Sequence, residues 1–568
     1  MMGKYLQWKI GGEAGFGIAT TGQIFCRSLV RAGYHIFGYM EYPSLIRGGH
    51  NTFAATISSE ECNSQIKDVH VLVCLNEETF NLHKEELIEG SVVVYDSSQF
   101  TPLRQGFAGQ AIFKLCDVAL VKLATETAGD SLMMNNVALG ASLKILGLPM
   151  DSLLEVISDT FSKKGLALVD KNQRAARAGY EIVTMSSFGL EKKEGTGNIV
   201  LTGNEATSLG AIASGCKFFA SYPMTPTSNV LTYLAGHEKE TGMIVREPED
   251  EIAAVNMAIG ASYAGVRSMT ATAGGGFSLM VEGVGLSAMT ETPLVVIEGA
   301  RGGPSSGMPT WTEQGDLKFV LNASQGDFPK IVIAPGDVSE MFYLTTEAFN
   351  LADSYQTVVY VLTDKYLAES YKCTPKYDTS KVIIDCGKIV SGVVENYKRY
   401  QITKDGVSPR AMPGMGMQFV VNSYEHNEEG LSEEGSAGRK AMADKRMRKL
   451  VKIKEEMPLP HFYGDENCDL TIVCWGSTKG PVLMAKKLLE EEGKRVGVIH
   501  FNYIWPFAKG TEELLKRQKK LLMIEGNVSG QMQGIIRQET GILIEDTLFK
   551  YDGRPFWPEE IVEYVKSK

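Results

Sequence analysis

Short apolar runs alternate with longer amphipathic stretches along most of the chain. The first apolar run, Tyr5–Ile10, leads into a glycine cluster and then into a helical pattern from Ile18 to Ala32. A strand, a glycine turn, a helix and a further strand form a βαβ opening, which predicts a parallel sheet and an α/β fold. Further apolar runs predict strands at His35–Tyr42, Thr52–Ile57, Val69–Leu75 and Ser91–Tyr95.

Two more α/β units follow a polar, glycine-containing linker at 186–196. The second unit begins at Ile199, and its apolar patterns predict helices at Glu205–Phe219 and Asp250–Gly265 and strands at Leu294–Glu298, Ile331–Ile333 and Val358–Leu362. The third unit begins at Asp469, with predicted strands at Leu470–Trp475, Val496–Phe501 and Leu521–Glu525 and a predicted helix at Gly480–Gly493.

The pattern weakens between the second and third units. Turn-rich sequence is followed by the acidic run Glu425–Glu434 and the basic run Lys445–Lys454. These charge runs favour a solvated loop and then an exposed helix. We therefore expect four parts, at 1–190, 197–370, 371–464 and 465–568, of which the third is an interdomain arm.

Composition and charge narrow the class of protein. With 568 residues the chain is too long for one hydrophobic core, and its 44% apolar and 22% charged residues are typical of a folded protein. The net charge of −11 argues against a nucleic-acid partner and against an anionic membrane surface. No apolar run is long enough to span a bilayer, and the start lacks the apolar region of a signal peptide, so we expect a cytoplasmic protein.

The nine cysteines are irregularly spaced, and none forms a CxxC pair. An odd number with such spacing argues against a disulfide framework, and the absence of clustered thiols argues against an iron–sulfur cluster on this chain. The eight histidines have no zinc-site spacing either. We expect no metal site on this chain.

The glycine cluster Gly11–Gly17 (GGEAGFG) could place backbone N–H groups against a phosphate. Glu41, near the end of the next predicted strand, occupies the usual place of a ribose-binding acid. However, Thr20 stands where a dinucleotide fingerprint has a third small residue. A tight turn or another phosphate contact is therefore favoured over nicotinamide binding, and a nicotinamide-dependent dehydrogenase remains an alternative.

Four segments of the second unit carry candidate chemistry, and each has a structural alternative. The SYPMTPTS segment, Ser221–Ser228, is a rigid loop rich in hydroxyls or a capped turn. Glu251 stands at the start of a predicted helix of small and apolar residues, which indicates a buried carboxyl group with a functional role. The alternative is that the acid only caps the helix and complements its dipole. The three glycines in Thr270–Gly283 permit close backbone approach or form a flexible turn. Arg301, just past a predicted strand, suits a carboxylate ligand or a structural salt bridge.

Taken in order, the segments YPMTP, EDEIAAVNMAIGASYAG, TATAGGGFSLM and ARGGPSSGMPT resemble the pyrimidine-binding domain of 2-oxoacid:ferredoxin oxidoreductases. Their alpha subunits with a fused N-terminal gamma domain resemble nearly the whole chain. The resemblance makes 1–190 the gamma domain, with GGEAGFG and Arg47–Asn51, and 197–370 the pyrimidine-binding domain. It makes 465–568, with WGSTKGP and IEGNVSGQM, a transketolase C-terminal-like domain.

The resemblance also implies residue roles. Glu251 matches the glutamate that binds N1′ of the aminopyrimidine of thiamine diphosphate, where a held proton lets the opposite amino group act as a base. Thr225 and Arg301 match residues that bind the carboxylate of the substrate. Tyr222 lies in the same motif as Thr225 and is also assigned to the substrate. Relatives commonly read TSGPG where this chain reads TAGGG, so no role is assigned to residues 273 or 275.

The implied protein is the alpha subunit of a CoA-dependent enzyme that oxidatively decarboxylates a 2-oxoacid and passes the electrons to ferredoxin. Its beta subunit would carry Mg²⁺, the diphosphate site and a [4Fe–4S] cluster, because this chain has neither a GDG…N segment nor clustered cysteines. The fused layout favours 2-oxoglutarate as the substrate. The resemblance also implies an αβ pair or its dimer, (αβ)₂, and a reaction that can run in reverse when ferredoxin is strongly reducing. A non-catalytic structural subunit is the other alternative.

Overall fold

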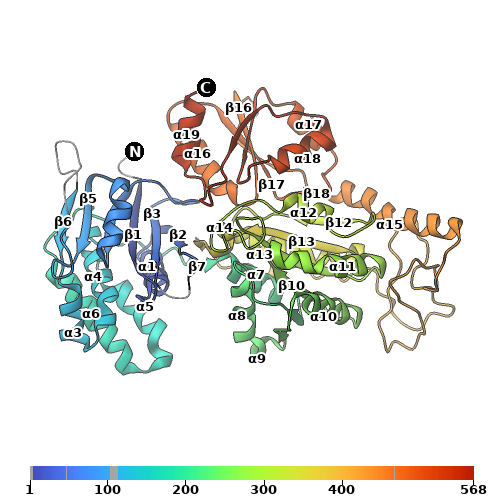
Figure 1. Cartoon of the computed structure of the whole chain (residues 1–568), viewed down its shortest axis with the longest axis horizontal. Helices are drawn as coiled ribbons and strands as arrows, with labels where there is room; N and C mark the ends of the chain where they lie inside the picture. Colours follow the sequence, from blue (N-terminus) through green and yellow to red (C-terminus); the bar gives the residue numbers. More distant parts are fainter. Residues whose placement is uncertain (1–3, 46–47, 103–112, 466) are drawn as a thin grey trace. The chain divides into compact units, whose positions relative to one another are not determined.

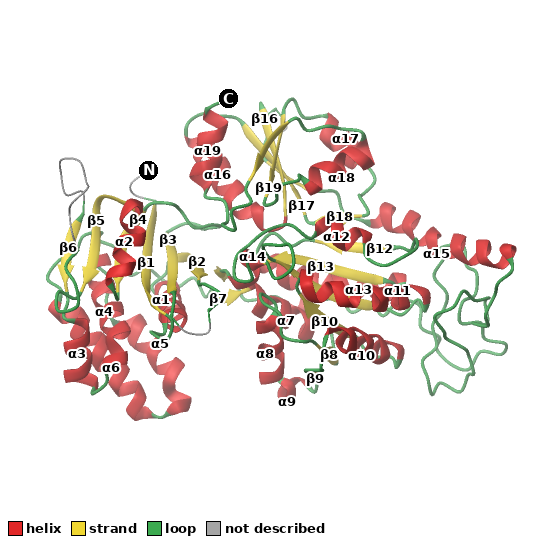
Figure 2. Ribbon diagram, viewed as in Figure 1, coloured by secondary structure: helices red, strands yellow, loops and turns green. Residues whose placement is uncertain are grey.

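The computed structural model describes residues 4–45, 48–102, 113–465 and 467–568. The chain forms two compact units (Figure 1). The first consists of Met1–Leu201, Glu369–Lys376 and Trp557–Ser567, and the second of Thr202–Ala368 and Tyr377–Phe556. Each unit mixes helices and strands (Figure 2), as the sequence predicts. None of the helices in the described part of the chain is both long and apolar enough to cross a membrane.

The first unit is built on an eight-stranded sheet with the order β6-β5-β4-β1-β3-β2-β14-β7. The parallel pairs β1–β4, β4–β5 and β5–β6 agree with the prediction. Strand β3 is antiparallel to both β1 and β2, so the predicted all-parallel arrangement is wrong there. The connection from β2 to β3 is too short for a helical crossover, which a parallel pair requires. The strands are β1 Tyr5–Glu13, β2 His35–Glu41, β3 His50–Ser58, β4 Val69–Cys74, β5 Leu87–Tyr95, β6 Lys114–Asp117, β7 Ile199–Thr202 and β14 Tyr371–Thr374.

Helices of the first unit pack closely at α4 and α6. A Cβ atom on Gly140 would lie 1.9 Å from the carbonyl oxygen of Ala176, and one on Gly179 would lie 1.9 Å from that of Val137. Only glycine permits this approach of the two backbones. The helices are α1 Ile18–Arg31, α2 Glu77–His83, α3 Leu120–Ala128, α4 Met134–Leu146, α5 Asp151–Phe161, α6 Leu166–Ile182 and α19 Pro558–Lys566.

The second unit contains a seven-stranded sheet with the order β18-β12-β13-β11-β10-β8-β9, which is parallel except for β18. The predicted helix at Glu205–Phe219 is too long, because α7 ends at Ala213 and Gly215, with φ 76°, turns the chain into β8. The strands are β8 Phe218–Ala220, β9 Ile244–Arg246, β10 Ser268–Thr272, β11 Leu294–Ala300, β12 Lys330–Ile333, β13 Val358–Asp364 and β18 Tyr503–Trp505. The helices are α7 Gly203–Ala213, α8 Ser228–Gly236, α9 Glu238–Thr241, α10 Glu251–Tyr263, α11 Gly274–Met289, α12 Leu317–Asn322, α13 Val338–Tyr355 and α14 Lys365–Glu369.

A five-stranded sheet, with the order β15-β17-β16-β19-β20, belongs to the same unit. The predicted strands Leu470–Trp475, Val496–Phe501 and Leu521–Glu525 are confirmed as β16, β17 and β19. The short strand β15 pairs antiparallel to β17, and the other pairs are parallel. The remaining elements are β15 His461–Tyr463, β20 Asp546–Phe549, α16 Lys479–Glu491, α17 Thr511–Lys516 and α18 Gln531–Thr540.

The arm is mainly loop up to the long helix α15, Ser436–Glu456 (Figure 2). The prediction that its basic run forms an exposed helix is half wrong. The run is helical, but Lys445 and Lys449 are buried and pair with Glu291, the latter at 2.7 Å. Burial alone would raise the pKa of Glu291. The positive charges of Lys445, Lys449 and Arg399 outweigh this effect and hold the pKa below its ordinary value. Charge complementarity with Glu291, just after α11, therefore anchors the arm within the second unit.

Replacing Glu291 by Gln is expected to lower the free energy of unfolding by about 3–5 kcal/mol, because two buried ammonium groups lose their counter-charge. The matched control is Asp444→Asn on α15, where the exposed pair with Lys440 at 2.7 Å is lost. That change should cost less than about 1 kcal/mol. Urea unfolding of both variants measures the difference, and equal losses would contradict the anchoring role of Glu291.

Candidate functional site

The candidate residues of the second unit lie at the carboxyl ends of neighbouring parallel strands. Tyr222 and Thr225 follow β8, Glu251 follows β9 and Arg301 follows β11. In the sheet these strands have the order β11-β10-β8-β9, so their loops meet at one edge. Ligands of open α/β sheets bind at this edge, outside the carboxyl ends of the strands.

Glu251 is the first residue of α10 and is only 3% exposed. Asp250, the residue before it, caps the helix by accepting a hydrogen bond from the N–H of Ala253 at 2.8 Å. Glu251 therefore does not serve as the cap, and its buried Oε1 has no hydrogen-bond partner. An unsatisfied carboxyl oxygen held inside a site is suited to a hydrogen bond with a ligand.

The space around this carboxyl depends on one glycine. A Cβ atom on Gly276 would lie 2.3 Å from Oε1 of Glu251 and 2.3 Å from Oγ1 of Thr272. β10 ends at Thr272 and α11 begins at Gly274, so the three glycines form the first turn of the helix and not a flexible turn before it. Gly276 thus lets α11 pack directly against the Glu251 carboxyl.

Arg301 and Thr225 are in direct contact. The Nη1 of Arg301 donates a hydrogen bond to the carbonyl oxygen of Thr225 at 2.9 Å. Within the described residues Arg301 forms no ion pair with a carboxylate at 4.0 Å or less, so the alternative of a structural salt bridge is not supported. Burial lowers the pKa of Arg301, while the charges of Asp316 and Glu298 oppose this shift.

The loop after β8 is held by its own hydroxyl groups. Ser221 Oγ donates to the carbonyl oxygen of Ala271 at 2.7 Å, and Thr227 Oγ1 donates to that of Met224 at 3.1 Å. Thr227 stands at the N-cap position of α8 but makes no side-chain capping bond, so the predicted capped turn is only partly realised. Tyr222 is exposed, and Thr225 is half-buried. This leaves Thr225 accessible beside the Arg301 guanidinium.

Sequence reasoning missed a group of buried acids near Arg301. Glu298, on β11, is fully buried, and burial, Asp316 and Asp364 raise its pKa well above the ordinary value. Asp316 lies against Gly274, where an added Cβ atom would be 2.6 Å from its Oδ2. The available signal was a glutamate inside the otherwise apolar run Leu294–Ala300. Such an interruption of a buried strand points to a specific use of the charge or proton.

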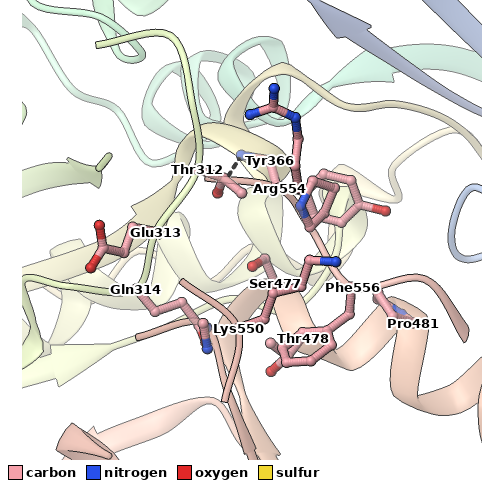
Figure 3. A pocket seen from close by; sticks show the side chains of 12 residues that line it. Thr312, Glu313, Gln314, Tyr366, Ser477, Thr478, Pro481, Lys550, Arg554 and Phe556 are labelled. Carbon is pink, nitrogen blue, oxygen red and sulfur yellow. Dashed lines mark hydrogen bonds between the residues drawn. The ribbon is translucent and has the colours of Figure 1, made fainter. Parts of the chain in front are cut away.

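A small cavity lies beside the loop that carries Asp316 (Figure 3). Its volume of about 20 Å³ has room for one water molecule. Around it, Gln314 donates to the Trp475 carbonyl at 2.9 Å and accepts from the Gly526 N–H at 2.8 Å. Asp364 accepts from Thr312 at 3.2 Å and from Ser477. The hydrogen bonds around the cavity thus hold the loop in place. The cavity itself is too small for a cofactor.

The glycine cluster of the first unit forms a tight turn. Gly15 and Gly17 have positive φ values of 101° and 73°, and Gly17 precedes the first residue of α1. Glu41 ends β2, while Arg47 lies outside the described residues. In the described ranges, no group of three or more His, Cys, Asp or Glu side chains is arranged to hold a metal ion.

Three family models match successive parts of the chain. Residues 7–182 match "Pyruvate ferredoxin/flavodoxin oxidoreductase", and residues 209–444 match "Pyruvate flavodoxin/ferredoxin oxidoreductase, thiamine diP-bdg". Residues 464–538 match "Transketolase, C-terminal domain". The middle match contains Thr225, Glu251 and Arg301. These matches and the parallel-sheet site define the chain as a subunit of a thiamine-diphosphate-dependent enzyme.

Relatives specify the family. The alpha subunit of 2-oxoacid:ferredoxin oxidoreductase from Sulfolobus sp is 34% identical over 98% of this chain and 96% of its own. The 2-oxoglutarate synthase subunit KorA of Methanothermobacter thermautotrophicus is 33% identical over 64% of this chain and 97% of its own. The solved 2-oxoglutarate:ferredoxin oxidoreductase from Magnetococcus marinus, with 2-oxoglutarate, coenzyme A and succinyl-CoA bound, has a TM-score of 0.91 at 32% identity and covers 99% of each chain. The chain belongs to the 2-oxoacid:ferredoxin oxidoreductase alpha-subunit family.

Proposed function

We propose that this chain supplies the aminopyrimidine half of the active site of a 2-oxoglutarate:ferredoxin oxidoreductase. The observation that carries the proposal is the buried Glu251 carboxyl, whose Oε1 lacks a partner and lies against Gly276. A heterocycle with a basic ring nitrogen would satisfy that oxygen through a proton held between the nitrogen and the carboxyl group. Thiamine diphosphate, when bound, supplies an activated carbon that attacks the keto group of the substrate. Glu251 holds a proton at N1′ of its pyrimidine ring.

The substrate carboxylate is assigned to Arg301, with Thr225 and Tyr222 beside it. Arg301 uses one N–H for the Thr225 carbonyl, which fixes the guanidinium and leaves other N–H groups for a ligand. A planar guanidinium can bind a carboxylate through two parallel hydrogen bonds. The nearby Thr225 hydroxyl adds a donor. The choice of 2-oxoglutarate is supported by the ligand named for the Magnetococcus enzyme and by the name of the Methanothermobacter relative.

A partner subunit is proposed to complete the site. Helix α10 buries Glu251 but exposes apolar side chains on its other face, and α11 adds one more. These exposed residues are Ile252, Met257, Tyr263 and Leu279. The surface between them is open at Gly260 and Gly275, where an added Cβ atom would meet nothing within 4 Å. Such a face suits a close protein contact. We assign it to a beta subunit that carries Mg²⁺, the diphosphate site and a [4Fe–4S] cluster.

The complex is proposed to use CoA and ferredoxin, to be an (αβ)₂ assembly and to run in reverse with strongly reduced ferredoxin. The four predicted parts, 1–190, 197–370, 371–464 and 465–568, are retained as gamma, pyrimidine-binding, arm and C-terminal domains.

The test is to co-express the chain with its beta-type partner, purify anaerobically and follow viologen reduction. 2-Oxoglutarate, pyruvate and a branched 2-oxoacid are each supplied with CoA, and either chain alone is the control. A preference for pyruvate would refute the substrate assignment, and no activity with any 2-oxoacid would favour a structural subunit.

Arg301→Lys should raise the KM for the 2-oxoacid by roughly 10- to 100-fold, because an ammonium group cannot bind a carboxylate through two parallel bonds. kcat should change less. The control is Arg246→Lys, an exposed arginine at the end of β9 that pairs with Glu238 at 3.2 Å. It should leave KM unchanged. Steady-state kinetics of the assembled enzyme tests this, and an unchanged KM for Arg301→Lys would remove the residue from the substrate site.

A further inference from the structure

A cavity of about 390 Å³ lies in the second unit, away from the candidate active site. Its volume is in the range of small-molecule sites. Lys330, in its wall, is the first residue of β12, so the cavity lies at the amino ends of the parallel strands. The candidate active site lies at their carboxyl ends. A ligand in this cavity would therefore not occupy the proposed substrate site.

Three parts of the second unit form the wall of this cavity. They are α12 with the loop that leads to β12, the arm helix α15, and β18 with α18, all of which are labelled in Figure 1. Strand β18 pairs with β12, so these parts also meet outside the cavity. The apolar and aromatic side chains of the wall include Leu321, Phe328, Leu450, Trp505 and Ile535. Much of the wall is thus suited to an apolar ligand body.

The Lys330 ammonium group is buried in this wall and has only neutral partners. Lys330 is 7% exposed, and its Nζ donates hydrogen bonds to the carbonyl oxygens of Leu321 at 2.9 Å and Ala323 at 3.0 Å. Nζ also lies 4.2 Å from the centroid of the Phe328 ring. In the described ranges Lys330 forms no ion pair with a carboxylate at 4.0 Å or less, and its third N–H meets no acceptor. A buried charge without a counter-charge is unfavourable, so an anion in the cavity would be stabilised here.

The other charged groups near the cavity do not neutralise Lys330. Lys318 and Asp327 line the cavity but are exposed to solvent, and their charges are of opposite sign. Lys454 and Glu539 pair with each other at 3.7 Å. Burial lowers the pKa of Lys330 to about 8, so the amine is still mainly protonated at neutral pH. The polar end of the cavity therefore carries one buried positive charge.

We propose that this cavity binds a small amphipathic carboxylate, with its carboxylate group at Lys330 and its apolar body against Leu450 and Trp505. A carboxylate oxygen gives the third N–H of Lys330 an acceptor and supplies the missing counter-charge. One negative charge matches the one buried ammonium group. Because the ligand would touch α15 and both sheets of the second unit, its binding should stabilise the folded chain. The inference does not rest on the proposed function.

Calorimetric titration of the purified full chain tests the site with two carboxylates, octanoate and 4-phenylbutyrate. At least one of them should bind with one site per chain and raise the Tm. The corresponding alcohol, octan-1-ol or 4-phenylbutan-1-ol, should bind at least about 10-fold more weakly, because the charge-assisted hydrogen bond is lost. Binding of neither carboxylate, or equal affinity for acid and alcohol, would overturn the proposal.

Variants of the wall locate the bound carboxylate. Lys330→Met keeps the apolar stem without the charge and should weaken binding at least about 10-fold. The matched control is Lys318→Met, where an exposed charge is lost, and affinity should stay within about 3-fold. Leu450→Trp enlarges a half-buried side chain of the wall and should weaken binding with Lys330 intact. It therefore keeps the test decisive if Lys330→Met fails to fold. Wild-type affinity in either folded variant would overturn the proposal.

The proposed substrate site is the competing place for a carboxylate. Arg301→Lys should bind the carboxylate probe with wild-type affinity, and saturating 2-oxoglutarate should not displace it. Loss of probe binding in Arg301→Lys, or displacement by 2-oxoglutarate, would assign the probe to the substrate site and overturn the inference. An enzyme without activity toward any 2-oxoacid would leave the binding result unchanged, so the proposed function can fail separately.

Discussion

Glu251→Gln is expected to lower kcat of the assembled enzyme by about 10²–10⁴-fold, the usual contribution of a positioned acid–base group. The amide has the shape of the carboxyl, so packing against Gly276 is preserved. It cannot, however, hold a proton at the ring nitrogen of the cofactor. Viologen reduction with saturating 2-oxoacid, CoA and thiamine diphosphate measures the loss.

The control for this variant is Glu249→Gln. Glu249 lies two residues earlier and is exposed, so the same chemical change should leave kcat within about 2-fold. Full activity of Glu251→Gln with the partner would reject the proposed contact with the cofactor. It would also favour the alternative in which this chain only positions a catalytic partner.

Gly276→Ala is expected to have an effect of similar size, although no catalytic group is altered. The added methyl group would lie 2.3 Å from the Glu251 carboxyl, far inside van der Waals contact. Because the φ of Gly276 lies outside the left-handed region, the helix itself accepts alanine. The carboxyl must therefore move, and a displacement of about 1 Å at a reacting centre can cost roughly 10²-fold in rate. Weaker thiamine diphosphate binding should accompany the loss.

Two comparisons isolate this cause. Gly275→Ala, one residue earlier in the same turn, meets nothing within 4 Å in this chain and should not disturb the Glu251 carboxyl. In a Glu251→Ala background, Gly276→Ala should cost little further, because the clash with the carboxyl is gone. Additive losses in the double variant would show that the methyl group acts elsewhere, for instance at Thr272. Cofactor titration and kcat of the four variants give the answer.

Local patterns were enough to predict most elements of the fold. The runs Leu470–Trp475, Val496–Phe501 and Leu521–Glu525 became strands with the predicted bounds, because each is a continuous apolar segment between turn residues. The predicted helix at Glu205–Phe219 failed at its end, where Gly215 and the aromatic residues after it favour a turn and a strand. The end of such a helix depends on a few residues, and on whether the residues that follow can pair with a neighbouring strand.

The sequence by itself determined the order of the α/β units, the motifs that mark the family and the positions of Thr225, Glu251 and Arg301 at strand or helix ends. These are properties of short segments, and periodicity and turn chemistry encode them locally. Since carboxyl ends of parallel strands share an edge, even the approach of these residues could be expected.

Only the tertiary structure decided which groups meet. The contact of Gly276 with Glu251 joins two residues that lie 25 positions apart, each in the first turn of a helix. The pairing of Lys445 and Lys449 with Glu291 joins segments more than 150 residues apart. Burial changes what a charged residue contributes to stability, because a charge that water solvates in a loop needs a partner once that water is removed. The basic run of α15 therefore anchors the arm instead of facing solvent.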